Sequence, residues 1–254
     1  MYDIDLQDAV PRRIVSHFRL GGRPRTVVWK AGENAGVIGQ LHRAGKVVVC
    51  YLDSGAAERY RPDWKLFPRN LILNNTGWNG EYWLDIRPGR WQQFAPIIWA
   101  RFALAKKIGC DGVEPDQNNP VGNVPRSAGI TLADEKAWYL QVAAMAHRYG
   151  LSVGMKNGIE SAVTDAATVR AFDWDLNEEC FFFRECGTLR RFIRAGKAVF
   201  QTEYTADWRS HSARYGNPAT LRRHVCALAR REQFTRSFSI LIKRKTPNEL
   251  FLHC

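Results

Sequence analysis

Short apolar, β-branched runs alternate with helical stretches along most of the chain. This alternation is typical of βαβ units and a parallel sheet, because strands buried on both faces are apolar throughout. A shorter run at Tyr82–Ile86 fits an additional strand within a loop. The strongest runs predict strands at Val47–Leu52, Gly112–Asp116, Ser152–Lys156, Asp173–Glu178, Ala198–Tyr204 and Phe238–Ile242, and two weaker candidates are Tyr2–Leu6 and Thr26–Trp29.

Helices are predicted in the segments between these strands. Pro96 must kink the first helix or mark its true start, and Thr131 with Asp134 resembles a capping box. Without a linker or repeat, the pattern predicts one α/β domain, a (β/α)₈ barrel over residues 1–254, close to the usual barrel length of about 250 residues. The predicted helices are Trp91–Lys107, Thr131–Tyr149, Arg190–Ala195 and Leu221–Gln233.

The formal net charge of +12 is unevenly distributed. Arg209–Lys245 holds ten Lys/Arg and one acid, whereas Cys110–Glu185 holds twelve Asp/Glu and six Lys/Arg. A basic flank could bind nucleic acid or an anionic surface, but we interpret this one as a solvated helix face and do not expect a nucleic-acid partner. No apolar run reaches the length of about 18 residues that a membrane span requires, and the acidic start differs from a secretory leader.

Six cysteines are present, an even number that permits disulfides. None forms a CxxC pair, and no histidine lies within a few residues of Cys180 or Cys186, so no structural zinc site is expected. Cys180–Cys186 and Cys226–Cys254 are the candidate pairs. Disulfides would favour an oxidising compartment, although the compartment stays open without a visible leader.

Polar residues follow the predicted strands where each strand ends. In a barrel these positions face the active-site mouth. Turn chemistry explains the Asp and Asn among them, since both cap helices. It does not explain why Glu, Lys and Tyr also occur at these strand-end positions. The residues are Asp53, Glu114, Asp116, Lys156, Asn157, Asn177, Glu178, Glu179, Glu203 and Tyr204.

Two carboxylates on separate strands could cleave a glycosidic bond, one as general acid and one as nucleophile or base. Alternation places Glu114 and Asp116 on one face of their strand. By the same rule Asn177 and Glu179 share a face, which favours Glu179 over Glu178 unless the strand end bulges. Aromatic side chains near these ends could stack on sugar rings; they are Tyr51, Trp64, Trp78, Trp83, Tyr204 and Trp208. No GxSxG, P-loop or HExxH motif occurs, and no cofactor or metal is expected.

Several blocks resemble glycoside hydrolase family 114, a family of TIM-barrel endo-α-1,4-polygalactosaminidases and relatives. Together they cover roughly residues 45–254 in order. The blocks are Val47–Gly55, Gly77–Glu81, Trp83–Arg87, Cys110–Asp116, Gly150–Asn157, Phe172–Trp174, Asn177–Cys186 and Gly196–Tyr204.

The resemblance implies hydrolysis of α-1,4-linked galactosamine polymers, with Asp116 and Glu178 as the catalytic pair and Glu179 in reserve. It also implies a ring of substrate-contacting neighbours around one mouth, namely Tyr51, Asp53, Glu114, Lys156, Asn157, Asn177, Glu179 and Tyr204. By family pattern the protein is expected outside the cell.

The chain departs from the family pattern at its start and after Asp116. It begins at the Tyr2–Asp5 strand, so the first family strand is missing or Thr26–Trp29 replaces it, and Gln117 stands where the family usually has Asn. A catalytically silent sugar-binding barrel and a basic nucleic-acid- or surface-binding protein are the alternatives. Turnover of an oligosaccharide and retention on DNA at about 200 mM salt distinguish them.

Overall fold

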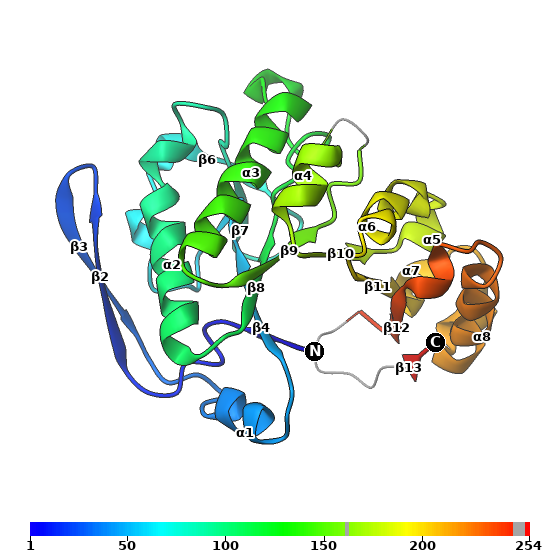
Figure 1. The fold of residues 1–254 in the computed structure, drawn as a ribbon. Helices are drawn as coiled ribbons and strands as arrows, with labels where there is room; N and C mark the ends of the chain where they lie inside the picture. Colours follow the sequence, from blue (N-terminus) through cyan, green and yellow to red (C-terminus); the bar gives the residue numbers. More distant parts are fainter. Residues whose placement is uncertain (161–162, 246–251) are drawn as a thin grey trace. The chain divides into compact units, whose positions relative to one another are not determined.

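The computed structural model describes residues 1–160, 163–245 and 252–254. They form two compact units, Met1–Lys156 and Asn157–Cys254. Each unit contains parallel strands joined by helices (Figure 1). The helices within the described ranges include none long and apolar enough to cross a membrane.

The first unit is built on a parallel sheet in the order β1-β4-β8-β9. Asp53 and Asp116 lie opposite each other in the β4–β8 register. Because parallel strands run the same way, their carboxyl ends meet at one edge of the sheet. The strands are β1 (Tyr2–Asp5), β4 (Val48–Asp53), β8 (Gly112–Asp116) and β9 (Ser152–Lys156).

Two long helices of this unit, α2 (Ala95–Ile108) and α3 (Leu132–Arg148), lie side by side in Figure 1. The rings of Trp99 and Trp138 stack between them with centroids 5.7 Å apart. Pro96 lies in the first turn of α2 and therefore marks its start instead of kinking it. The predicted capping box of α3 is present. A short helix, α1 (Val37–Arg43), precedes β4.

Two antiparallel insertions complete the first unit. The prediction that Thr26–Trp29 is a barrel strand is wrong: β3 (Arg23–Trp29) pairs with β2 (Ile14–Leu20) in a separate hairpin. Gly21 and Gly22 both adopt positive φ, so the chain reverses tightly and β3 folds back on β2. The predicted loop strand exists as β7 (Glu81–Leu84), between β5 (Ala56–Glu58) and β6 (Ile72–Asn75).

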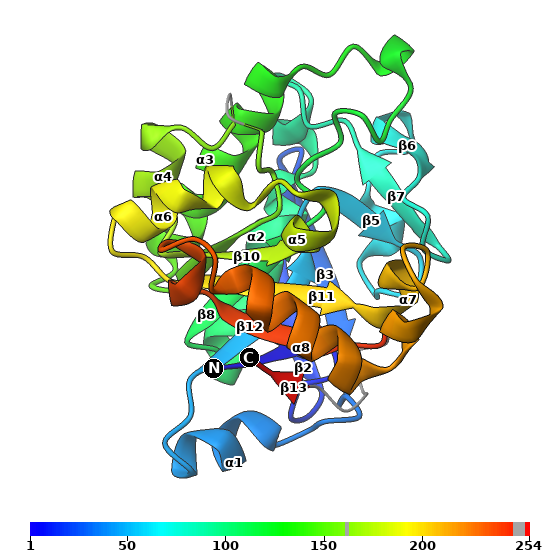
Figure 2. The ribbon, with the colours of Figure 1, turned by 90° about the vertical axis from the view of Figure 1, so that its right-hand side faces the viewer.

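The described residues of the second unit form three parallel strands and one short antiparallel strand. Helix α8 packs over β12, as Figure 2 shows. The strands are β10 (Trp174–Glu178), β11 (Val199–Tyr204), β12 (Ser239–Lys243) and β13 (Leu252–His253). The helices are α4 (Ala166–Ala171), α5 (Cys180–Phe183), α6 (Arg190–Arg194), α7 (Thr205–Trp208) and α8 (Pro218–Ala229).

Three disulfides link the six cysteines. The candidate pairs Cys180–Cys186 and Cys226–Cys254 are both confirmed. The third pair, Cys50–Cys110, had no local signal because its members lie 60 residues apart.

Short 3₁₀ turns also occur between the main elements. They lie at Trp64–Leu66, Arg69–Leu71, Trp91–Gln93, Arg126–Ala128, Cys186–Leu189, Ala213–Gly216 and Thr235–Ser237.

Candidate active site

The strand ends of the first unit gather two carboxylates around one lysine. Lys156 Nζ lies 2.6 Å from Glu114 Oε1 and 3.4 Å from Asp116 Oδ2. All three side chains are buried, and the prediction that Glu114 and Asp116 share a face is confirmed. The ammonium group offsets the repulsion between the two acids and holds both in place.

Asp116 receives hydrogen-bond donors on both carboxylate oxygens. The backbone N–H of Gln117 donates to Oδ1 over 2.7 Å, and the Lys156 ammonium lies 3.4 Å from Oδ2. Donors and a nearby cation stabilise a carboxylate in its charged form. Asp116 is therefore equipped to act as a nucleophile or as a base.

Asp53 differs from Asp116 in its electrostatics. Its side chain is fully buried, and burial raises its pKa well above the ordinary value, with like charges on Glu58, Glu81 and Asp116 adding to the shift. Burial also raises the pKa of Glu81. The hydroxyl of Tyr51 donates to Asp53 Oδ1 over 2.8 Å. The environment therefore favours a neutral Asp53.

The segment after β8 is held in a strained backbone conformation. Gln117 has φ 59°, and its Nε2 donates to Glu81 Oε1 over 2.9 Å. Gly55 packs so closely that an added Cβ would lie 1.7 Å from the Gln117 carbonyl oxygen. Gln117 thus holds Glu81 beside the strand ends. Sequence reasoning did not identify Glu81, because the short loop strand that carries it has no alternation signal to mark a buried acid.

A buried arginine supports this cluster from helix α2. Arg101 donates to both carboxylate oxygens of Asp63, each over 2.8 Å, to Glu58 Oε2 over 2.8 Å and to the Asp53 carbonyl over 2.9 Å. These contacts anchor the turn after β4. Helical periodicity alone did not identify Arg101, since arginine normally lies on the exposed face of a helix.

In the second unit, Glu178 is held by two side-chain donors. The Tyr204 hydroxyl donates to Glu178 Oε1, and Asn157 Nδ2 donates to Oε2 over 3.3 Å. Asn157 also accepts the backbone N–H of Glu178 through Oδ1 over 3.0 Å. Three residues predicted for the site are thus brought together. These two donors fix the orientation of the half-buried Glu178 carboxyl group.

Glu179 does not continue the strand, because β10 ends at Glu178 and Glu179 takes a left-handed φ of 63°. The alternation of strand side chains therefore ends at Glu178. It does not extend to Glu179, so it cannot be used to favour Glu179 over Glu178. Burial raises the pKa of Glu179 to about 8, and the charges of Asp207 and Glu203 add to the shift. Glu179 is accordingly a half-buried acid that stays protonated near neutral pH.

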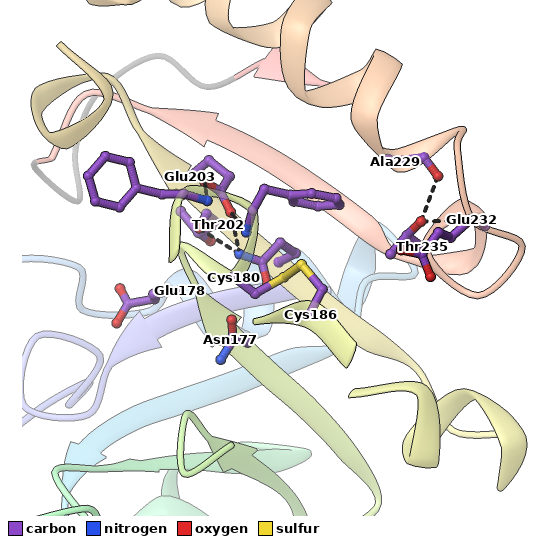
Figure 3. The surroundings of a disulfide bond; sticks show 12 residues. Asn177, Glu178, Cys180, Cys186, Thr202, Glu203, Ala229, Glu232 and Thr235 are labelled. Carbon is purple, nitrogen blue, oxygen red and sulfur yellow. Dashed lines mark hydrogen bonds between the residues drawn. A yellow bond between two sulfur atoms is a disulfide. The ribbon is translucent and has the colours of Figure 1, made fainter. Parts of the chain in front are cut away.

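Asn177 lies on another side of β10 from Glu178, as Figure 3 shows. Its side chain is buried, and Nδ2 approaches Asn157 Oδ1 at 3.5 Å.

Of the described aromatic candidates, Trp83 and Trp208 are buried and pack within the protein, whereas Trp78 is 56% exposed.

Glu203 anchors the loop bridged by Cys180–Cys186 (Figure 3). Its carboxyl group accepts the backbone N–H of Phe181 over 3.0 Å, that of Phe182 over 3.3 Å and Trp208 Nε1–H over 2.6 Å. Burial, which outweighs these bonds, raises its pKa to about 7. Although it lies near the end of β11, Glu203 therefore stabilises the protein's own loop by accepting its hydrogen bonds.

In the described ranges, no group of three or more His, Cys, Asp or Glu could hold a metal ion.

Comparison with known proteins extends these observations. The profile of the glycoside-hydrolase family GH114 matches residues 25–254. Aspergillus fumigatus Ega3, solved in complex with galactosamine, superposes with a TM-score of 0.72 at 29% identity, over 86% of this chain and 82% of that chain. The glycoside hydrolase domain of PelA from Pseudomonas aeruginosa gives a TM-score of 0.59 at 15% identity, over 85% of both chains, and at that identity it bears on the fold alone. No match occurs among curated protein sequences.

These similarities confirm the predicted α/β barrel class, with an atypical start in which β1 is followed by the β2–β3 hairpin. They also confirm that the protein is a glycoside hydrolase. The matched residues include every predicted site residue and parts of both compact units. The chain belongs to glycoside hydrolase family 114.

Proposed function

We propose that the protein is an endo-acting hydrolase of α-1,4-linked galactosamine-containing polysaccharide that uses Asp116 and Glu178. Membership of the family and the likeness to Ega3, crystallised with galactosamine, support the substrate class. The observation that carries the residue assignment is that each of these acids has its own set of donors at a strand's carboxyl end: Lys156 and Gln117 for Asp116, and Tyr204 and Asn157 for Glu178.

In the proposed reaction Glu178 is the general acid and Asp116 the nucleophile or base. Glu178 gives its proton to the glycosidic oxygen as the bond from that oxygen to C1 breaks. Asp116 either attacks C1 directly or takes a proton from water as the water attacks. One water is consumed, its hydroxyl ending on C1. Lys156 holds Asp116 in place through its ammonium group, and Tyr204 with Asn157 orients the Glu178 carboxyl.

We further propose that the neighbouring polar residues contact the sugar. Asp53 and Glu179, which the environment keeps neutral, can both donate to and accept from sugar hydroxyls or amides. Glu114 adds negative charge that suits an amino sugar. The remaining proposed contacts are Tyr51, Lys156, Asn157, Asn177 and Tyr204.

We also propose that the two units act as one catalytic domain in an oxidising, extracellular compartment. The family profile runs through both units without interruption, which supports the first point. Three disulfides support the second, because such bonds persist in oxidising environments.

The test is digestion of galactosamine-containing exopolysaccharide followed by mass spectrometry of the fragments. Internal cleavage gives a ladder of oligomers, and Asp116→Asn and Glu178→Gln each lower the rate by about 10²-fold or more while substrate still binds. Glu179→Gln is the matched comparison and retains most activity, because an amide keeps the neutral hydrogen-bonding character of this sugar contact. Near-full activity in folded Glu178→Gln together with an inactive Glu179→Gln would assign the acid to Glu179. The anomer formed first, followed by NMR, separates direct attack by Asp116 from water activation.

A further inference from the structure

A cleft lies on the first unit between β2 and α2, away from the strand ends that carry the proposed chemistry. Its volume is 480 Å³, within the range of about 300–1,000 Å³ that small-molecule sites occupy. Figure 1 shows the β2–β3 hairpin standing beside α2. The family profile begins at residue 25, so β2 lies outside the matched region. The cleft is therefore made partly by an element that the family resemblance does not explain.

The segment that contains the β2–β3 hairpin beside the cleft is cationic. Residues 9–32 contain five Arg and one Lys without any Asp or Glu. In the described structure none of these six side chains takes part in an ion pair. Helix α2 contains no acid either, and its exposed Lys107 lines the cleft with His17 of β2. A concave surface with unpaired positive charge attracts and concentrates anions.

The walls of the cleft also offer flat aromatic surfaces. Phe18, Trp99 and Tyr149 line it, together with the hydroxyl-bearing Ser16. The ring of Trp99 is fixed by stacking on Trp138, so little conformational entropy is lost when a ligand covers it. Aromatic faces pack well against the C–H face of a pyranose ring, whereas a phosphate chain has no such apolar face. The cleft thus combines a sugar-stacking surface with positive charge.

The edge of β2 supplies further hydrogen-bonding groups. Within the described sheets β2 pairs with β3 alone, and four consecutive β2 residues, 15–18, line the cleft. An unpaired strand edge presents backbone N–H and C=O groups. These groups match the hydroxyls of a sugar chain lying along the strand.

We propose that this cleft is an accessory binding site for a carboxylated polysaccharide, a linear polymer of uronic acid. Its carboxylates pair with Lys107 while the unpaired positive charge of the hairpin attracts the polymer, and its rings lie against Trp99 and Tyr149. The site is independent of hydrolysis, and it would hold the enzyme on an anionic polymer while the strand-end site acts on an amino sugar chain.

The experiment measures binding of polygalacturonate to the full-length chain in about 150 mM NaCl, with neutral dextran as the control polymer. Ala103 is exposed and lines the cleft, whereas Ala144 is exposed on α3 outside it. Ala103→Glu and Ala144→Glu change the net charge equally on exposed helical positions. We expect Ala103→Glu to raise the Kd about tenfold or more and Ala144→Glu less than about twofold. Both variants keep wild-type hydrolytic activity.

Three outcomes overturn the proposal. The first is no binding of polygalacturonate, and the second is equal weakening by the two substitutions, which would reduce the effect to net charge. The third is tighter binding of duplex DNA or phosphatidylserine vesicles than of polygalacturonate at the same salt. Hydrolysis is assayed separately, so a failure here is distinguishable from a failure of the proposed catalytic function.

Discussion

Removal of the Cys50–Cys110 disulfide is expected to lower the free energy of unfolding by about 4 kcal/mol. A cross-link stabilises mainly by restricting the unfolded chain, and the effect grows with the logarithm of the closed loop. The two cysteines are 60 residues apart, for which the chain-entropy relation gives about 4 kcal/mol at 25 °C. For the separation of 6 residues between Cys180 and Cys186, the same relation gives about 2 kcal/mol.

The two bonds are compared in the double variants Cys50→Ala/Cys110→Ala and Cys180→Ala/Cys186→Ala. Urea unfolding followed by tryptophan fluorescence gives the free energies, and calorimetry gives the Tm values. The first variant should lose roughly 8–16 °C in Tm, because 1 kcal/mol shifts a chain of this size by about 2–4 °C. Loss of the buried sulfur atoms of Cys50 and Cys110 adds to the cost.

The control is wild-type protein reduced with dithiothreitol, which loses at least as much stability as either variant. A loss below about 1 kcal/mol for the Cys50 pair, or a larger loss for the Cys180 pair, would show that loop entropy does not govern these bonds. Retained hydrolytic activity in the folded Cys50 variant would show in addition that the bond serves stability and not the position of Asp53.

Three further substitutions test the packing and charge around the strand ends. Gly55→Ala should cost about 2 kcal/mol or more in urea unfolding and lower activity, because the added methyl overlaps the Gln117 carbonyl; exposed Gly187→Ala, with nothing near its Cβ and no positive φ, is the control, and equal losses would refute the overlap. Arg101→Met should cost about 3–5 kcal/mol, since Asp63 loses its buried counter-charge and Glu58 keeps only that of Arg61; Arg101→Lys should recover part of it, and an unchanged stability would contradict the argument. The pKa of Glu203 is raised to about 7, so its protonation stabilises the folded state below pH 4.5 and this contribution is lost as pH rises to about 7. The stability advantage of wild type over Glu203→Gln should therefore shrink by about 3 kcal/mol between about pH 4 and pH 8, and a constant difference would rule the raised pKa out.

The sequence by itself determined the strand pattern and the candidate acids. Buried parallel strands are continuous apolar runs, so seven of the eight predicted sheet strands appear at or within a residue or two of their predicted bounds. Cap chemistry is equally local, which is why Thr131 and Asp134 marked the start of α3 correctly. Alternation also placed Glu114 and Asp116 on one face, since a regular strand has a side-chain period of two.

Only the tertiary structure decided features that depend on distant partners. Thr26–Trp29 has the composition of a buried strand, yet its pairing with β2 removes it from the parallel sheet. Glu203 lies next to the end of β11 like the other candidates, but it accepts hydrogen bonds from α5 and α7 and so supports a loop.

Backbone conformation at Glu179 and burial of Arg101 likewise depend on the folded environment. A one-dimensional pattern records which residues can be buried or charged. Which oppositely charged groups, cysteines or strand edges meet is set by contacts between segments tens of residues apart, and those contacts exist only in the folded chain.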